Sequence, residues 1–174
     1  MSEKKRWICL YVENEIGVLA RISGLFSGKS YNLNSLTVGE TEDTTISRMT
    51  ISFTSDDRIF EQVKKQLNRS VEVIKVVDYT DIPIHNKEIL FIKVKECNTD
   101  DKDEVFRIAN AFNFRITDYD KKNILVECLQ TENQNNDAIK LFKQSFPNRI
   151  EVVRGGSVAV EAISMSERKR GKRL

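Results

Sequence analysis

The order strand–helix–strand–strand–helix–strand is expected twice in succession along this chain of 174 residues. In the first copy, apolar runs typical of strands lie at residues 7–12, 33–39, 46–53 and 71–79, and helices are expected at 18–27 and 56–67. In the second copy, strands are expected at 88–94, 115–119, 123–129 and 150–153, helices at 103–112 and 137–146, and residues 158–163 are a candidate edge strand. Two copies of one order predict two tandem domains of the α+β class.

Each copy is expected to form a split β-α-β unit, in which four antiparallel strands carry both helices on one face. The right-handed crossover rule places the first and third strands in the middle of each sheet. The first strand is apolar on both faces, because its odd positions are as apolar as its even ones: Trp7, Cys9 and Tyr11 alternate with Ile8, Leu10 and Val12. The face without helices therefore needs a cover, and we expect a second sheet or a second subunit there, with the chain at least dimeric.

The domain boundaries follow from this order. Pro83 lies between the two copies and cannot occupy a central strand, so we expect a first domain at residues 1–80, a linker at 81–87 and a second domain at 88–163. Residues 164–174 form a basic tail. The last eight residues hold five bases and one acid, and without them 25 acidic and 23 basic residues remain. The net charge of +2 thus belongs to the tail and does not indicate a general affinity for polyanions.

The composition excludes several classes of function. No apolar run approaches the roughly 20 residues of a membrane helix, and the charged segment at 1–6 leads into too short an apolar stretch for a cleaved signal peptide. Cys9, Cys97 and Cys128 lie far apart, which predicts neither a zinc site nor a disulfide framework and favours the reducing cytoplasm. The single histidine, His85, has no catalytic or metal-binding partner at the usual spacing, and the seven glycines form no phosphate-binding loop. We therefore expect no metal and no catalytic residue in this chain.

The turn between the first expected strand and helix, residues 12–19, is the segment best suited to a ligand. The start of a helix offers unpaired N–H groups to a carboxylate, and Gly17 would let a ligand approach the backbone. Asn14 carries both a donor and an acceptor, which suit the ammonium and the carboxylate of an amino acid. Three apolar residues could surround a small aliphatic side chain: Ile16, Val18 and Leu19. The alternative is structural, with Asn14 capping the helix and Gly17 easing the turn.

A second polar segment opens the next strand at residues 32–36, which read NLNSL. Such a segment is typical of a turn that leads into a strand. The functional alternative is that Asn32, with Leu33 beside it, reaches a ligand held by another subunit.

Three segments together carry a resemblance to a known family: residues 12–27 (VENEIGVLARISGLFS), 31–38 (YNLNSLTV) and 46–51 (ISRMTI). In these segments the chain resembles the regulatory (small) subunits of acetohydroxyacid synthase, also called acetolactate synthase. The resemblance is close over residues 7–80 and continues more weakly at 87–94 and 150–154.

The resemblance implies an N-terminal ACT domain followed by a C-terminal ferredoxin-like domain. It implies a homodimer that binds valine between its ACT domains, activates a separate catalytic large subunit and conveys feedback inhibition in branched-chain amino-acid biosynthesis. Thiamine diphosphate, magnesium and a flavin would then belong to the catalytic subunit, and this chain would bind none of them. Ligands one methylene shorter or longer than valine would differ in affinity by about 1–3 kcal/mol, so leucine or isoleucine would bind weakly.

The effector contacts of the family correspond to Asn14, Gly17 and Asn32 of this sequence. Two positions depart from the family pattern: Ser30 stands where Gly usually precedes the aromatic–Asn pair, and Ile16 is bulkier than the usual Pro or Ser. Both departures bear on the response to valine. The second copy has no Asn-x-x-Gly turn, because residues 95–100 read KECNTD, so no second amino-acid site is expected there.

Two other functions are open at this point. One is an ACT-type amino-acid sensor that regulates a different enzyme. The other is RNA binding, because the same order of elements occurs in RNA-recognition domains. The expected third strand has a single Phe over residues 48–53, without the Gly-aromatic pattern of those domains. A short basic tail is usually a solvated chain end, so we expect neither nucleic acid nor a membrane as partner.

Overall fold

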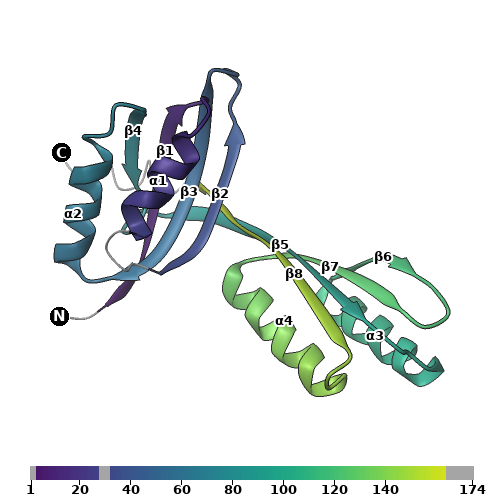
Figure 1. The fold of residues 1–174 in the computed structure, drawn as a ribbon. Coiled ribbons are helices and arrows are strands. Elements are labelled where there is room, and N and C mark those ends of the chain that lie inside the picture. Colours follow the sequence, from purple (N-terminus) through teal and green to yellow (C-terminus); the bar gives the residue numbers. More distant parts are fainter. Residues whose placement is uncertain (1–2, 28–31, 164–174) are drawn as a thin grey trace. The chain divides into compact units, whose positions relative to one another are not determined.

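The computed structural model describes residues 3–27 and 32–163. The chain divides into two compact units, one formed by Met1–His85 together with Val158–Leu174 and the other by Asn86–Ser157. Two long strands, β5 (Ile84–Val94) and β8 (Ile150–Glu161), contribute residues to both units (Figure 1). β5 begins at Ile84, inside the expected linker at 81–87, and residues 158–163 of the described chain group with the first unit. Ser30 and the basic tail at 164–174 lie outside the described residues.

The first unit contains an antiparallel sheet with the strand order β2-β3-β1-β4, so the first and third strands lie in the middle as predicted. Its elements are β1 (Lys4–Glu13), α1 (Val18–Ser27), β2 (Leu33–Glu40), β3 (Ile46–Ser55), α2 (Asp57–Leu67) and β4 (Val73–Asp78). Both helices cover one face of this sheet (Figure 1), where their apolar stripes pack on Ile8, Leu10 and Val12 of β1. Aromatic rings from α1 and β3 meet at the centre of this core, with the ring centroids of Phe26 and Phe53 5.4 Å apart.

The second apolar face of β1 is covered by the chain itself. Trp7 and Cys9 form a buried cluster with Tyr79 and Ala159, and other apolar residues pack against it: Tyr11, Val77, Ile82 and Ile84. Ala159 comes from β8, near the other end of the sequence. These contacts account for the apolar residues of this face around Cys9, so they are not by themselves evidence for a second subunit.

The second unit repeats the arrangement of the first. Its further elements are α3 (Thr99–Phe112), β6 (Arg115–Tyr119), β7 (Ile124–Gln130) and α4 (Glu132–Ser145), and the strand order is β6-β7-β5-β8. Its core joins Leu90, Ile92 and Val94 of β5 to Val105 and Phe142 of the helices. Among the described helices of both units, none has the length and apolar character that crossing a membrane would require.

Both helices of the second unit begin earlier than the sequence pattern predicts, at Thr99 instead of residue 103 and at Glu132 instead of residue 137. The reason is a capping box at each start. The side chain of Asn98 accepts a hydrogen bond from the backbone N–H of Asp101 at 2.8 Å, and the Asp101 carboxylate accepts one from the N–H of Asn98 at 3.0 Å. Thr131 and Gln134 form the same motif at α4. These caps satisfy N–H groups of a polar first turn that carries no apolar stripe.

The end of the chain also differs from the prediction, because residues 150–153 and 158–163 are not separate strands. β8 runs without interruption through Gly155 and Gly156. A Cβ atom built on Gly155 would lie 2.5 Å from Cγ2 of Ile89 on the neighbouring strand β5. Gly155 therefore allows β8 to continue beside β5 without a steric clash.

We expect Gly155→Ala to lower the free energy of unfolding by about 1–3 kcal/mol, because the added methyl group forces Ile89 out of its position. Urea denaturation followed by far-ultraviolet circular dichroism measures this change. Gly39→Ala is the matched control, since a Cβ at Gly39 meets no atom within 4 Å. Equal free energies of unfolding for the two variants would contradict the prediction.

Candidate functional site

The turn between β1 and α1 is fixed by backbone contacts to the residues that directly precede β3 and β4. The N–H of Glu13 donates to the carbonyl of Glu72 at 2.9 Å, and the N–H of Asn14 donates to the carbonyl of Thr45 at 2.8 Å. Gly17 has a φ of +87°, a value that L-residues with a side chain rarely adopt. The turn therefore requires glycine at this position for its backbone conformation. This agrees with the alternative in which Gly17 serves to ease the turn.

Asn14 does more than begin a turn, because its side chain makes three hydrogen bonds. Its Nδ2 donates to the carbonyl of Thr44 at 2.9 Å and to Oε1 of Glu40 at 3.1 Å, and its Oδ1 accepts from Oγ of Ser47 at 2.9 Å. All three partners belong to the hairpin of β2 and β3. Asn14 thus holds the start of the turn on this hairpin. At the other end of the turn, the N–H of Val18 in the first turn of α1 donates to the carbonyl of Glu15 at 3.3 Å.

The three apolar residues predicted to surround a ligand lie on different sides of the helix start. Val18 is 2% exposed and belongs to the hydrophobic core. Ile16 is fully exposed and Leu19 is 44% exposed. Within one chain, Ile16 and Leu19 offer apolar surface to a ligand or a partner, whereas the side chain of Val18 faces the core.

Asn32 and Leu33 lie at the other end of the sheet. Leu33 pairs with Phe53, whereas Glu40, which contacts Asn14, pairs with Ser47. The eight residues from Leu33 to Glu40 are separated by seven steps, which span about 24 Å in an extended strand. One chain therefore does not bring Asn14 and Asn32 together. Asn32 is exposed, and Leu33 is half-buried against the core.

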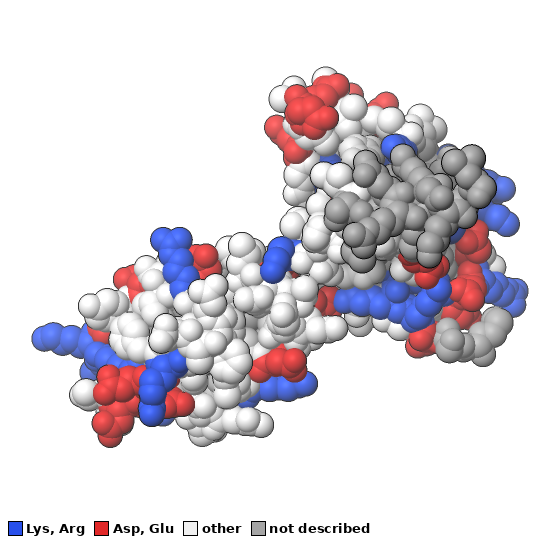
Figure 2. Space-filling model, turned by 180° about the vertical axis from the view of Figure 1, so that it is seen from behind, with Lys and Arg blue, Asp and Glu red and all other residues white. Residues whose placement is uncertain are grey.

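Acidic residues surround the Asn14 end of this site. Glu40, Glu42 and Asp43 lie exposed at the turn between β2 and β3, and acidic groups gather at this tip of the first unit (Figure 2). Hydrogen bonds from the hydroxyl and the N–H of Thr45 lower the pKa of Asp43, so this carboxylate stays ionised. Nε of Arg21 in α1 lies 2.6 Å from Oε1 of Glu72. The exposed carboxylates favour the ammonium group of a ligand, and the start of α1 favours its carboxylate.

The partners of Asn14 were not predicted from the sequence. Glu40, Thr44 and Ser47 reach Asn14 only because β3 pairs with β1 and β2 pairs with β3. The one local signal is that all three are polar and lie at or near the ends of two expected strands.

Comparisons with known proteins match both halves of the chain. A family profile described as the ACT domain of acetohydroxyacid synthase (AHAS) small subunits matches residues 8–75, and a second, described as small subunit of acetolactate synthase, matches residues 87–163. The acetolactate synthase small subunit of Aquifex aeolicus is 42% identical over 158 residues, which cover 90% of this chain and 81% of that protein. The chain belongs to the acetolactate synthase small-subunit family. The Haemophilus influenzae small subunit is 35% identical over 90% of this chain and 94% of its own length.

A solved structure confirms the predicted fold of this family member. The crystal structure of the acetolactate synthase small subunit from Thermotoga maritima superposes with a TM-score of 0.82 at 30% identity, and covers 91% of this chain and 98% of that one. The resemblance and the tandem ACT and ferredoxin-like fold predicted from the sequence are therefore confirmed.

The cysteines of this small-subunit family member are free and buried. Burial raises the pKa of the Cys9 and Cys97 thiols and raises the pKa of Cys128 to about 12. A thiol with a raised pKa is a poor nucleophile at neutral pH. Within residues 3–27 and 32–163, no three His, Cys, Asp or Glu side chains are grouped so that they could hold a metal ion.

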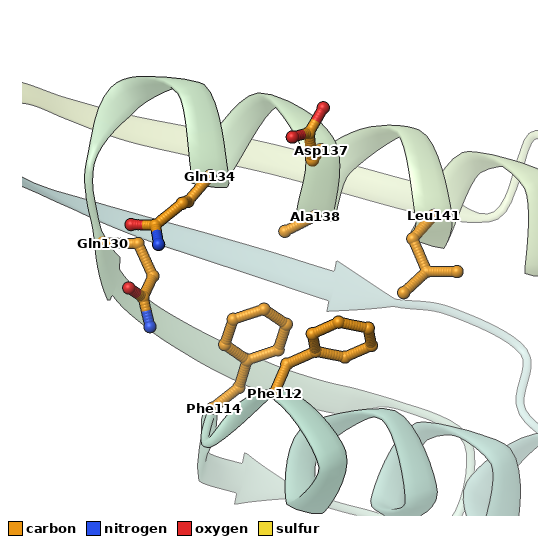
Figure 3. Close-up of a pocket in the computed structure, with 7 residues that line it drawn as sticks. All are labelled: Phe112, Phe114, Gln130, Gln134, Asp137, Ala138 and Leu141. Atoms are coloured by element: carbon orange, nitrogen blue, oxygen red, sulfur yellow. The ribbon is translucent and has the colours of Figure 1, made fainter.

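The second unit contains a cleft of about 450 Å³ between α3 and α4 (Figure 3). The rings of Phe112 and Phe114 stack in it at 5.7 Å, and Leu141 points toward them from α4. Its polar lining consists of Gln130, Gln134 and Asp137. Asp137 pairs with Lys140 at 3.3 Å, and Oε1 of Gln134 accepts from Thr131 in the cap of α4. The cleft is a mainly apolar hollow that the sequence analysis did not predict.

Proposed function

We propose that this chain is the non-catalytic regulatory subunit of an acetolactate synthase, which activates a catalytic large subunit and conveys feedback inhibition by valine. The observation that carries the proposal is the similarity to acetolactate synthase small subunits along 90% of the chain, through both domains. The buried thiols, which are poor nucleophiles, support a role without catalysis in the described part of the chain.

The proposed effector site needs two copies of the chain. β2 is the outermost strand of its sheet, so one of its edges lies at the margin of the sheet. If two β2 strands paired antiparallel about a two-fold axis, Asn32 of one copy would lie beside the Asn14 end of the other, because the pairing reverses the strand direction. This arrangement closes the distance of about 24 Å that separates the two asparagines within one chain.

A valine molecule suits the groups that such a dimer would gather. The N–H groups of Leu19 and Ala20 in the first turn of α1 would bind the carboxylate, and Oδ1 of Asn14 together with Asn32 would contact the ammonium end of the ligand. The exposed side chains of Ile16 and Leu19 would contact the isopropyl group, with Val18 and Leu33 behind them in the core. Binding would then stabilise the dimer. An effector that binds two conformational states of a protein with unequal affinity shifts the equilibrium between those states.

The proposed complex places the cofactors in the other subunit. Thiamine diphosphate, magnesium and a flavin would be held by the catalytic large subunit, and this chain would act on them only through the contact between subunits. The three free cysteines fit the reducing conditions of the cytoplasm, where we place the complex.

Reconstitution with the catalytic large subunit tests the proposal. Adding this chain should raise acetolactate formation from pyruvate, valine should reverse the increase, and this chain alone should form no acetolactate. Calorimetry of the isolated chain against all twenty amino acids should give heat for valine, and sedimentation should give a mass of twice 20.1 kDa. Binding of an unrelated amino acid without activation would favour a sensor for another enzyme.

A further inference from the structure

A second hollow lies along the edge of the second sheet, between α4 and β8, with a volume of about 640 Å³. On α4 it is lined at the spacing i, i+3, i+4 and i+7, by Asn136, Ile139, Lys140 and Lys143. On β8 it is lined by alternate residues, Ile150, Val152 and Arg154. One stripe of a helix and one face of a strand therefore form the walls of this groove, which we name the β8 groove.

The β8 groove is positively charged. Lys140, Lys143 and Arg154 line it, and none of its lining residues is acidic. Arg154 is held in place, because its Nε and Nη2 donate to the Glu88 carboxylate at 2.9 and 2.7 Å. Lys140 has a single exposed partner, Asp137, and Lys143 has no ion pair within the described part of the chain. The two lysines therefore give the groove its net charge, beside an apolar floor.

The backbone of β8 offers hydrogen bonds on the same side. β8 is the last strand in the order β6-β7-β5-β8. The N–H of Lys95 donates to the carbonyl of Arg149, so odd-numbered residues at the start of β8 direct their backbone groups toward β5. The backbone groups of Ile150, Val152 and Arg154 consequently point to the free edge, next to the groove that their side chains line.

We propose that the β8 groove binds an acidic, extended segment of the catalytic large subunit, which adds to β8 as a fifth strand. Strand addition uses backbone hydrogen bonds for affinity and alternate side chains for specificity. Residues 150–154 span about 13 Å, so roughly five residues of the partner would pair. Carboxylates of the segment would meet Lys140 and Lys143, and its apolar residues would meet Ile139, Ile150 and Val152.

The identity of the partner as the large subunit rests on the proposed function. The chemistry of the segment rests on the groove. A peptide is favoured over a nucleic acid because no aromatic ring lines the groove, and single-stranded nucleic acids are bound mainly by stacking on aromatic rings. The competing explanation is protective, since lysines beside an edge strand prevent self-association.

A charge-reversal variant tests the electrostatic contribution to binding in the β8 groove. The double variant Lys140→Glu with Lys143→Glu, in the full-length chain, should weaken binding to the catalytic large subunit by roughly tenfold or more, with a weaker dependence on salt. Biolayer interferometry at two salt concentrations measures both effects. The matched control is Lys121→Glu with Lys122→Glu, which reverses two exposed charges in the β6–β7 turn of the same unit and should bind like the wild type.

A backbone variant tests the strand addition. Val152→Pro removes an N–H that points to the free edge and takes no part in pairing with β5, which is the position in an edge strand where proline is tolerated. It should weaken binding by roughly tenfold while the salt dependence stays that of the wild type. Circular dichroism shows whether Val152→Pro is folded, and the charge-reversal variant keeps the test valid if it is not.

The outcomes separate this inference from the proposed function. If the wild-type chain binds the large subunit and both variants bind it equally well, strand addition at β8 is overturned and the proposed function stays intact. Self-association of the charge-reversal variant with unchanged binding would show a protective role instead. Retention of an RNA oligonucleotide at physiological salt, lost in the charge-reversal variant, would assign the groove to a polyanion and overturn the inference. Failure of the wild-type chain to bind the large subunit would overturn both.

Discussion

The variant Asn14→Ala is expected to abolish valine inhibition while activation of the catalytic large subunit stays within about twofold of the wild type. Asn14 makes three side-chain hydrogen bonds that hold the β1–α1 turn on the β2–β3 hairpin. Loss of two or three such bonds, at about 1 kcal/mol each, corresponds to a roughly 30- to 150-fold weaker response. Acetolactate formation as a function of valine concentration measures the response, and calorimetry measures the affinity directly.

The control for Asn14→Ala is Asn110→Ala, which truncates an exposed asparagine of α3 and should change neither activation nor inhibition. Ser47→Ala adds a graded comparison, since it removes only the hydrogen bond to Oδ1 of Asn14. Parallel loss of activation and inhibition in Asn14→Ala would mean that the turn contacts the large subunit and is not a separate effector site. Unchanged inhibition would instead favour the cleft between α3 and α4 as the effector site.

The order of elements could be predicted from the sequence because it depends on local patterns. The β-branched and apolar runs of β1, β3 and β7 and the apolar stripes of α1 and α2 lie close to where the pattern places them. The starts of α3 and α4 were missed, because capping boxes at Asn98 and Thr131 begin each helix with a turn of polar residues. The continuity of β8 was missed as well, since two adjacent glycines usually indicate a break, and here Gly155 makes room for Ile89.

The candidate site was predicted only as far as local sequence determines it. The positive φ of Gly17 and the exposure of Ile16 follow from a tight turn at a helix start. The hydrogen-bond partners of Asn14 depend on which strands pair, and the cover of Cys9 depends on Ala159 from the end of β8. Contacts between residues so far apart in the sequence are set by the tertiary fold, and no spacing pattern contains them.

The second large effect is expected from Glu88→Ala, which should destabilise the second unit by about 3 kcal/mol. Glu88 is 4% exposed and connects three elements. Its carboxylate accepts two hydrogen bonds from Arg154 of β8 and one from Nδ2 of Asn135, a fully buried residue of α4, at 3.0 Å. Truncation leaves the guanidinium of Arg154 without its buried counter-ion and removes one acceptor from Asn135. Thermal unfolding should show a midpoint lower by roughly 10 °C or more for a unit of this size.

A matched control distinguishes the buried pair from ion pairs in general. Glu151 of the same unit also pairs with a cation, since its carboxylate lies 2.6 Å from Nζ of Lys95, but both side chains are about half exposed. Water replaces such a partner readily, so Glu151→Ala should unfold close to the wild-type midpoint. Glu88→Gln should lie between the two, because it keeps the shape and part of the hydrogen bonding but loses the charge. A midpoint for Glu88→Ala equal to that of Glu151→Ala would contradict the view that burial makes this pair important to the second unit.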